Sequence, residues 1–278
     1  PTSPEFAMKK ILALGYPKIF QICKAYRYEP KSSTHNPEFT ILEWYRAQSG
    51  FEQIMDDVEA LFEFICQGLF QSKTFETKEY SVQNLARPWK RLTIEDCFRS
   101  FARLEITELQ TSLLIADACI RLGLLAKSDR DSALWDDCFF RIMMNIVEPE
   151  LKKLNQPVII YNYPPSQAAL SNLFTDERGF KWAKRFEVYA GGIELANAFD
   201  ELTNADEQRA RFTKDMALRK TLYGNAMPIS PIDEDFLKAL EKMSATGGIA
   251  LGVDRLAMYF SGTDKIQDVL WGVSHWPE

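Results

Sequence analysis

Residues 18–46, KIFQICKAYRYEPKSSTHNPEFTILEWYR, decide the fold of this chain. Apolar and polar side chains alternate over 18–29 and again over 39–46, which predicts two β-strands. The segment between them is polar and contains two prolines, so we expect a long antiparallel hairpin. A connecting loop with so many polar side chains is typical of a ligand-binding segment.

The rest of the chain predicts a mixed α+β domain in which helices are inserted between antiparallel strands. Apolar residues at helical spacing or strongly charged faces predict helices over 51–71, several over 93–154, and one each over 206–223 and 236–243. Strand patterns return at 157–163 and at 185–199, the second interrupted by a turn at Gly191-Gly192. The last pattern is GGIALGVDRLAMYF at 247–260, which predicts a buried strand running into a helix near Asp254.

Composition narrows the function classes. Apolar residues make up 46% of 278 residues and charged residues 26%, as in an ordinary globular protein. No apolar window is long enough for a membrane span. The net charge of −6 (33 basic minus 39 acidic residues) argues against a protein that mainly coats nucleic acid. Five widely spaced cysteines indicate a reduced, cytoplasmic protein, and only two histidines leave little room for zinc or a Ser-His-Asp triad.

The hairpin carries the first group of candidate functional residues. These are Arg27, Glu29, His35, Asn36 and Phe39. An arginine facing a cleft can hold a phosphate in a bidentate manner, and an aromatic ring can stack on a base. The alternative is a surface ion pair between Arg27 and Glu29 and an ordinary loop histidine.

A second group lies in GIELANAFDELT at 192–203 and comprises Glu194, Asn197 and Glu201. Glu194 and Asn197 share one face only if the strand has a bulge or bend near Ala196. Two carboxylates and an amide in an apolar wall suit Mg²⁺, and we expect Glu194 and Glu201 to converge on one ion. A half-exposed sheet with solvated acids is the alternative.

The third group is GGIALGVDR at 247–255. Its glycine spacing matches neither a Walker A loop nor a dinucleotide fingerprint. Its glycines permit close approach of a ligand, and Arg255 at a helix start adds a positive charge. Arg255 could equally serve packing.

In this order, the three groups resemble the catalytic core of class II aminoacyl-tRNA synthetases. TSPE at 2–5, FQICKAYRYE, THNPEFTILEWY, GIELANAFDELT and GIALGVDR are similar to the lysyl-tRNA synthetase lineage. Ala250 replaces a glycine of that lineage, and there is no room for an anticodon-binding barrel. Together with YPPSQAALS at 163–171, these departures resemble the paralogous family that ligates (R)-β-lysine to elongation factor P. The resemblance implies a single catalytic domain over 1–278, an antiparallel sheet flanked by helices, and a helical insertion at about 93–154.

The resemblance also implies roles for individual residues. Arg27 and Arg255 would be the catalytic arginines, and Glu194 and Glu201 the Mg²⁺ ligands. The ATP site would consist of Arg27, Glu29, His35, Asn36, Phe39, Glu194, Leu195, Gly252 and Arg255. The amino-acid site would consist of Ser3, Glu5, Glu43, Tyr45, Asn197, Glu201 and Ala250, with acids surrounding the two amines of the substrate.

The implied reaction is ATP-dependent adenylation of (R)-β-lysine or lysine, followed by transfer to a lysine of elongation factor P. Two alternatives remain at this point: a reduced lysyl-tRNA synthetase that charges tRNA, and a non-catalytic regulatory module. The missing anticodon module disfavours tRNA. The first motif of the family, which builds a homodimer interface, would precede Pro1, so we expect a dimer formed through it.

Overall fold

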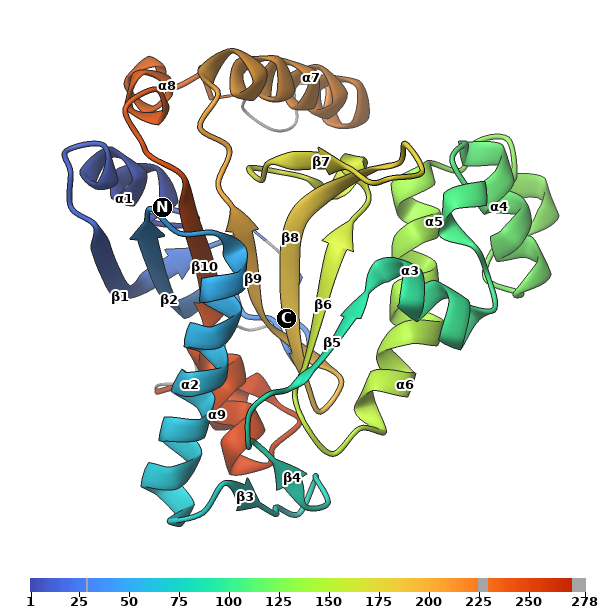
Figure 1. Cartoon of the computed structure of the whole chain (residues 1–278). Helices are drawn as coiled ribbons and strands as arrows, with labels where there is room; N and C mark the ends of the chain where they lie inside the picture. Colours follow the sequence, from blue (N-terminus) through green and yellow to red (C-terminus); the bar gives the residue numbers. More distant parts are fainter. Residues whose placement is uncertain (29, 225–229, 272–278) are drawn as a thin grey trace.

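The computed structural model describes residues 1–28, 30–224 and 230–271 (Figure 1). Its strands are β1 Lys18–Tyr26, β2 Glu38–Ala47, β3 Thr74–Phe75, β4 Gln83–Asn84, β5 Lys90–Thr93, β6 Val158–Tyr163, β7 Leu173–Thr175, β8 Lys181–Ala190, β9 Ile193–Asp200 and β10 Thr246–Gly252. Its α-helices are α1 Glu5–Leu12, α2 Phe51–Phe70, α3 Ile94–Cys97, α4 Ser112–Arg121, α5 Trp135–Ile142, α6 Glu148–Lys152, α7 Ala205–Tyr223, α8 Glu234–Leu240 and α9 Val253–Ser261. Short 3₁₀ or π turns occupy Phe98–Ala102, Ile106–Glu108, Lys127–Asp129, Met143–Val147, Pro165–Gln167 and Ile266–Asp268.

One large sheet organises these elements. Its strand order is β1-β2-β10-β9-β8-β6-β5, and β7 pairs with β8. The predicted hairpin is confirmed, since β1 and β2 pair antiparallel from Lys18 opposite Arg46 to Tyr26 opposite Glu38. Strand β10 then lies between β2 and β9. The three motif-bearing segments, which are the hairpin, residues 192–203 and residues 247–255, are therefore neighbours although they are far apart in sequence.

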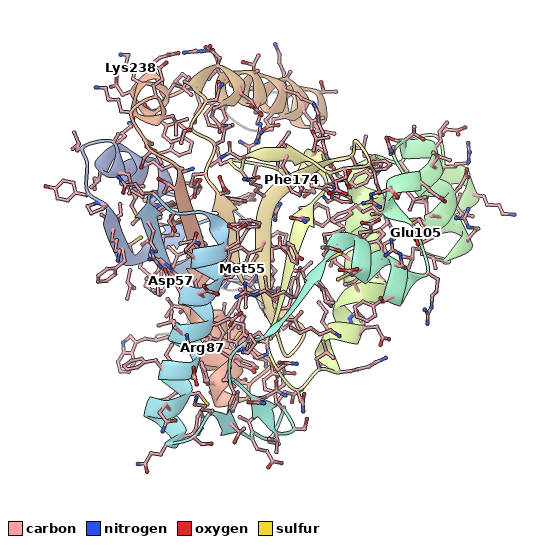
Figure 2. All side chains as sticks on the ribbon, viewed as in Figure 1. Met55, Asp57, Arg87, Glu105, Phe174 and Lys238 are labelled. Atoms are coloured by element: carbon pink, nitrogen blue, oxygen red, sulfur yellow. The ribbon has the colours of Figure 1, made fainter. Side chains whose placement is uncertain are left out.

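Helices α2 and α9 cover one face of the sheet (Figure 1). The central core between them and the sheet contains buried side chains from both helices and from four strands of the large sheet, among them Met55, Phe62, Val188, Ile249 and Tyr259. Figure 2 labels Met55 on α2, and its side chain is only 3% exposed. Because this face is closed by packing, the opposite face of β2, β10, β9 and β8 is the one left for a site.

The predicted helical insertion is confirmed and has a core of its own. It spans α3 to α6 and packs against β5, β6 and β8, with Phe98, Phe139, Ile142 and Ile160 all buried. Its first helix begins at a capping box, in which Thr93 and Asp96 bond each other's backbone N–H groups at 2.9 and 3.0 Å. No helix within the described residues is long and apolar enough to cross a membrane.

Three features differ from the sequence-based expectation. Helix α1 was not predicted, because it is short and its buried residues, Met8, Lys9 and Leu12, include a charge. Strand β5 pairs parallel with β6, so the sheet is not wholly antiparallel. Helix α8 starts earlier than predicted because Asp233 caps it through the Phe236 N–H at 2.9 Å.

Candidate active site

A cavity of about 410 Å³ lies on the open face of the sheet, over the three motif-bearing segments. Residues on β2, β9, β10 and the hairpin line it, together with the segment before α1. All of the predicted site residues line this cavity except Glu29, Tyr45 and Glu201. Glu29 lies outside the described residues, and the other two are buried, with 3% and 1% of their surfaces exposed.

The predicted bulge in β9 brings the polar residues of this strand to one face. Val188 is opposite Ala196 and Tyr189 is opposite Glu194, so Leu195 is the extra residue. This confirms the expected irregularity, one position before Ala196. As a result, both Glu194 and Asn197 line the cavity despite their odd spacing.

One end of the cavity is cationic and aromatic. The guanidinium of Arg27 lies over the ring of Phe39, 5.1 Å from the centroid. The side-chain amide of Asn36 donates to the carbonyl of Glu38 at 2.6 Å, which orients the loop at the start of β2. This arrangement presents a planar cation beside an aromatic ring, as recognition of a phosphate next to a base requires.

Arg255 connects the hairpin loop to β9 at this cationic end of the cavity. It donates from Nε to the Thr34 carbonyl at 3.2 Å and from a terminal nitrogen to the Glu194 carbonyl at 2.8 Å. Its other terminal nitrogen is 2.8 Å from Nε2 of His35, and Nδ1 of His35 lies 2.9 Å from the Ser32 hydroxyl. Arg255 therefore fixes the hairpin loop against β9 while its charge remains in the cavity.

The other end of the cavity is acidic. Glu43 accepts hydrogen bonds from the Ser3 hydroxyl at 2.6 Å and from the Tyr45 hydroxyl at 2.8 Å. Burial raises the pKa of Glu43 to about 6, although both of these hydrogen bonds favour the charged form. Burial also raises the pKa of Tyr45 well above its ordinary value, so its hydroxyl stays a donor.

Glu201 belongs to this acidic end as well. One of its oxygens lies 2.6 Å from the ammonium of Lys9, which is also 2.6 Å from Glu5. Burial raises the pKa of Glu201, and the adjacent Lys9 ammonium opposes that shift. This geometry overturns the expectation that Glu194 and Glu201 converge on one ion. The two carboxylates have separate partners, and seven positions on an extended strand separate them by on the order of 20 Å at about 3.3 Å per residue.

Glu194 instead faces Glu187, which the sequence analysis did not identify. Glu187 is opposite Asn197, and Tyr189, two residues further along β8, is opposite Glu194. The pKa of Glu194 is raised to about 7, first by removal from water and then by the Glu187 carboxylate. Burial, and then the same carboxylate, also raises the pKa of Glu148 on α6.

Two carboxylates that repel each other across paired strands fit a divalent cation. Mg²⁺ commonly takes one or two carboxylates and completes its shell with water and substrate phosphates. No compact cluster of three or more metal-binding side chains occurs within the ranges that the structure describes. A metal held by Glu187 and Glu194 alone would therefore depend on the phosphates of a nucleotide.

Arg185 is a second residue that the sequence analysis missed. It is 9% exposed and donates to the Asn197 side chain at 3.1 Å and to the Gln167 carbonyl at 2.7 Å. It also forms an ion pair with Glu187. A sequence pattern could have identified both Arg185 and Glu187. RFEVY at 185–189 repeats polar side chains at alternate positions of a strand that is otherwise buried.

Comparisons with known proteins agree with this geometry. The family model for class II tRNA synthetases (D, K and N) matches residues 1–271. Proteins named elongation factor P–(R)-β-lysine ligase from Salmonella arizonae and Salmonella gallinarum are each 36% identical over 274 residues. The match covers 97% of this chain and 75% of each relative.

Proposed function

Because the chain belongs to the class II tRNA synthetase family (D, K and N), together with the elongation factor P–(R)-β-lysine ligases, we propose that it activates (R)-β-lysine with ATP. The resulting aminoacyl-adenylate donates its acyl group to a lysine side chain of elongation factor P. One observation carries this proposal: a single cavity joins a cationic, aromatic end to an end lined by carboxylates. The first end suits ATP, and the second suits the two ammonium groups of a lysine-type substrate.

In this proposal the chain binds and orients both substrates and supplies no nucleophile. Arg27 and Arg255 hold the phosphates of ATP and stabilise the charge that develops at the α-phosphate. His35 and Asn36 would help to place the nucleotide, with Phe39 stacked on its base. Leu195 and Gly252 line the cavity beside them.

Mg²⁺, held by Glu187 and Glu194, would neutralise charge on the phosphates of ATP when bound. Both residues lie on the cavity face of the sheet, next to the Arg255 contact with Glu194. Glu201 is assigned to the amino acid, since its carboxylate is paired with Lys9 at the opposite end.

The amino-acid substrate would lie along β2, β10 and β9. Glu43, Tyr45 and Glu201 would receive its distal ammonium, and Ser3, Glu5 and Asn197 its other amine and carboxylate. Held there, the carboxylate attacks the α-phosphorus as the bond to pyrophosphate breaks. The acceptor amine then attacks the activated carbonyl carbon, the bond to AMP breaks, and the amine loses a proton.

The alternative of a non-catalytic regulatory module is disfavoured by the residues themselves. Arg27, Arg255 and Glu194 all line the same cavity, whereas a regulatory paralogue would have no need of them. Transfer to tRNA remains the second candidate function, because the family model includes synthetases that charge tRNA. An acceptor that serves translation would place the reaction in the cytoplasm, and we retain the expectation of a homodimer.

The test is an ATP–pyrophosphate exchange assay with (R)-β-lysine and with α-lysine, followed by a transfer assay. We expect exchange that depends on a lysine-type amino acid, and a mass increase on elongation factor P. Efficient charging of tRNA with lysine, with elongation factor P unmodified, would establish the second candidate instead. No exchange with either amino acid would reject the adenylation chemistry.

A further inference from the structure

Lys9 is a fully buried charge that none of the proposed steps uses. It lies in the middle of α1, and its exposed fraction is 0%. Lysine is almost never fully buried unless its ammonium is paired. Here the ammonium is 2.6 Å from Glu5 and 2.6 Å from Glu201, and it lies 5.9 Å from the centroid of the Phe236 ring.

The two partners of Lys9 come from different elements. Glu5 lies one helical turn before Lys9 on α1 and lines the cavity. Glu201 directly follows β9 and bonds the Thr246 carbonyl through its backbone N–H at 2.8 Å. The Lys9 ammonium therefore links a carboxylate of the helix to a carboxylate of the sheet.

The charges at the acidic end of the cavity show how this Lys9 link could serve substrate binding. Glu5, Glu43 and Glu201 are three acids, and Glu43 receives its hydrogen bonds from the neutral hydroxyls of Ser3 and Tyr45. Lys9 supplies one positive charge, so the group carries two net negative charges when all three acids are ionised. A lysine-type substrate brings two ammonium groups, which match that number.

Resting on the proposed function, we propose that Lys9 is a positioning residue for the amino-acid substrate. By binding Glu5 and Glu201 at once, it holds these two carboxylates in place and favours their charged forms, which the two amines of the substrate require. Lys9 need not touch the substrate, because its effect passes through the two acids.

Loss of Lys9 would change the protonation of Glu201. The groups that face Glu201 are Lys9 and Glu5 from α1 and Glu43 and Tyr45 from β2, while α8 contributes the apolar ring of Phe236 beside Lys9. Burial and the two acids all raise the pKa of Glu201, and Lys9 alone among these groups lowers it. Removing Lys9 therefore raises this pKa further and extends the neutral form of Glu201 to higher pH.

The test compares Lys9→Met with Lys10→Met in pyrophosphate exchange from pH 6.5 to 9.5. Lys10 is the matched control, since it is adjacent but pairs with the half-exposed Asp233 at 2.7 Å. We expect Lys9→Met to raise the KM for (R)-β-lysine at least tenfold at pH 7 relative to wild type. This ratio should shrink as pH rises, by up to about tenfold per unit, because Glu201 regains its charge. The KM for ATP should stay unchanged.

The double variant Lys9→Met/Glu201→Gln keeps the test decisive if the single variant fails to fold. It removes both charges of the pair, so its KM should be high at every pH. A Lys9→Met defect that is independent of pH, or that raises the KM for ATP equally, would overturn the proposal. So would a pH-dependent KM ratio in the double variant. Absence of exchange in the wild type would reject the proposed function itself.

Discussion

Ala250→Gly is the substitution that tests substrate choice most directly. Ala250 lies on β10, opposite Glu43 on β2 and opposite Asn197 on β9, and it lines the cavity. Directly opposite residues in an antiparallel sheet project to the same face. The methyl group of Ala250 therefore projects between two side chains of the proposed amino-acid site, whereas its neighbour Ile249 belongs to the central core.

The size of the effect follows from that one methyl group. α-Lysine carries its amine next to the carboxylate, where the Cβ of Ala250 would crowd it, and (R)-β-lysine carries its amine one carbon further away. A difference of one methyl or methylene in a site is worth about 1–3 kcal/mol, or roughly 10- to 200-fold in selectivity. The cost of glycine in a strand is about 0.5–1 kcal/mol, which is small against a typical total stability of about 5–15 kcal/mol.

The assay is pyrophosphate exchange with both amino acids, expressed as the ratio of kcat/KM for α-lysine to kcat/KM for (R)-β-lysine. We expect Ala250→Gly to raise this ratio within the range above. Ala198→Gly is the matched control, because Ala198 lies on β9, opposite Ile249 and Phe186, and belongs to the central core. An unchanged ratio in Ala250→Gly, or an equal change in the control, would refute the steric reasoning.

Four further predictions concern the rest of the site. Arg255→Ala should lower pyrophosphate exchange by at least about 10²–10³-fold with an unchanged circular dichroism spectrum, because it removes a cation that stabilises the negative charge developing at the α-phosphate. Exchange at the wild-type rate would contradict this role. Gly248→Ala would place a Cβ 2.1 Å from an oxygen of Glu201, so urea unfolding should show a loss of about 1–3 kcal/mol, and unchanged stability would count against the packing described. Glu187→Gln should raise the Mg²⁺ concentration needed for half-maximal exchange. In the wild type that concentration should also rise as pH falls from 8 to 6, because the pKa of Glu194 is raised to about 7 and protons then compete with the ion; a requirement unaffected by either change would place the metal elsewhere.

Strand periodicity and turn residues were sufficient to predict the elements that build the sheet. The hairpin was expected from its alternating pattern, β6 and the β8–β9 pair from strand patterns with a Gly191-Gly192 turn, β10 from a glycine-flanked apolar run, and α2 from its helical spacing. Strand β5 was not, because four residues, KRLT at 90–93, are too few to show a period. Its parallel pairing with β6 depends on the whole insertion returning to the sheet, which no local pattern encodes.

The candidate site was predictable where residue type and spacing carry chemistry, as in the hairpin and in GIALGVDR. The metal prediction went wrong for a geometric reason. Glu194 and Glu201 were the two glutamates of GIELANAFDELT, and nothing in their spacing shows in which direction each carboxylate points. The side chains around each carboxylate decide its direction. Glu194 faces Glu187 of the adjacent strand, and Glu201 pairs with Lys9 of a helix that the sequence did not predict.

The bulge at Leu195 explains why one short strand can serve both substrates. Without the extra residue, strict alternation would place Glu194 on the core face whenever Asn197 faces the cavity. With it, Glu194 reaches the cationic end, where it contacts Arg255, while Glu201 stays in register at the acidic end. Deleting the bulge would leave one of these two ends without its carboxylate, so the irregularity is a requirement of the site and not a defect of the sheet.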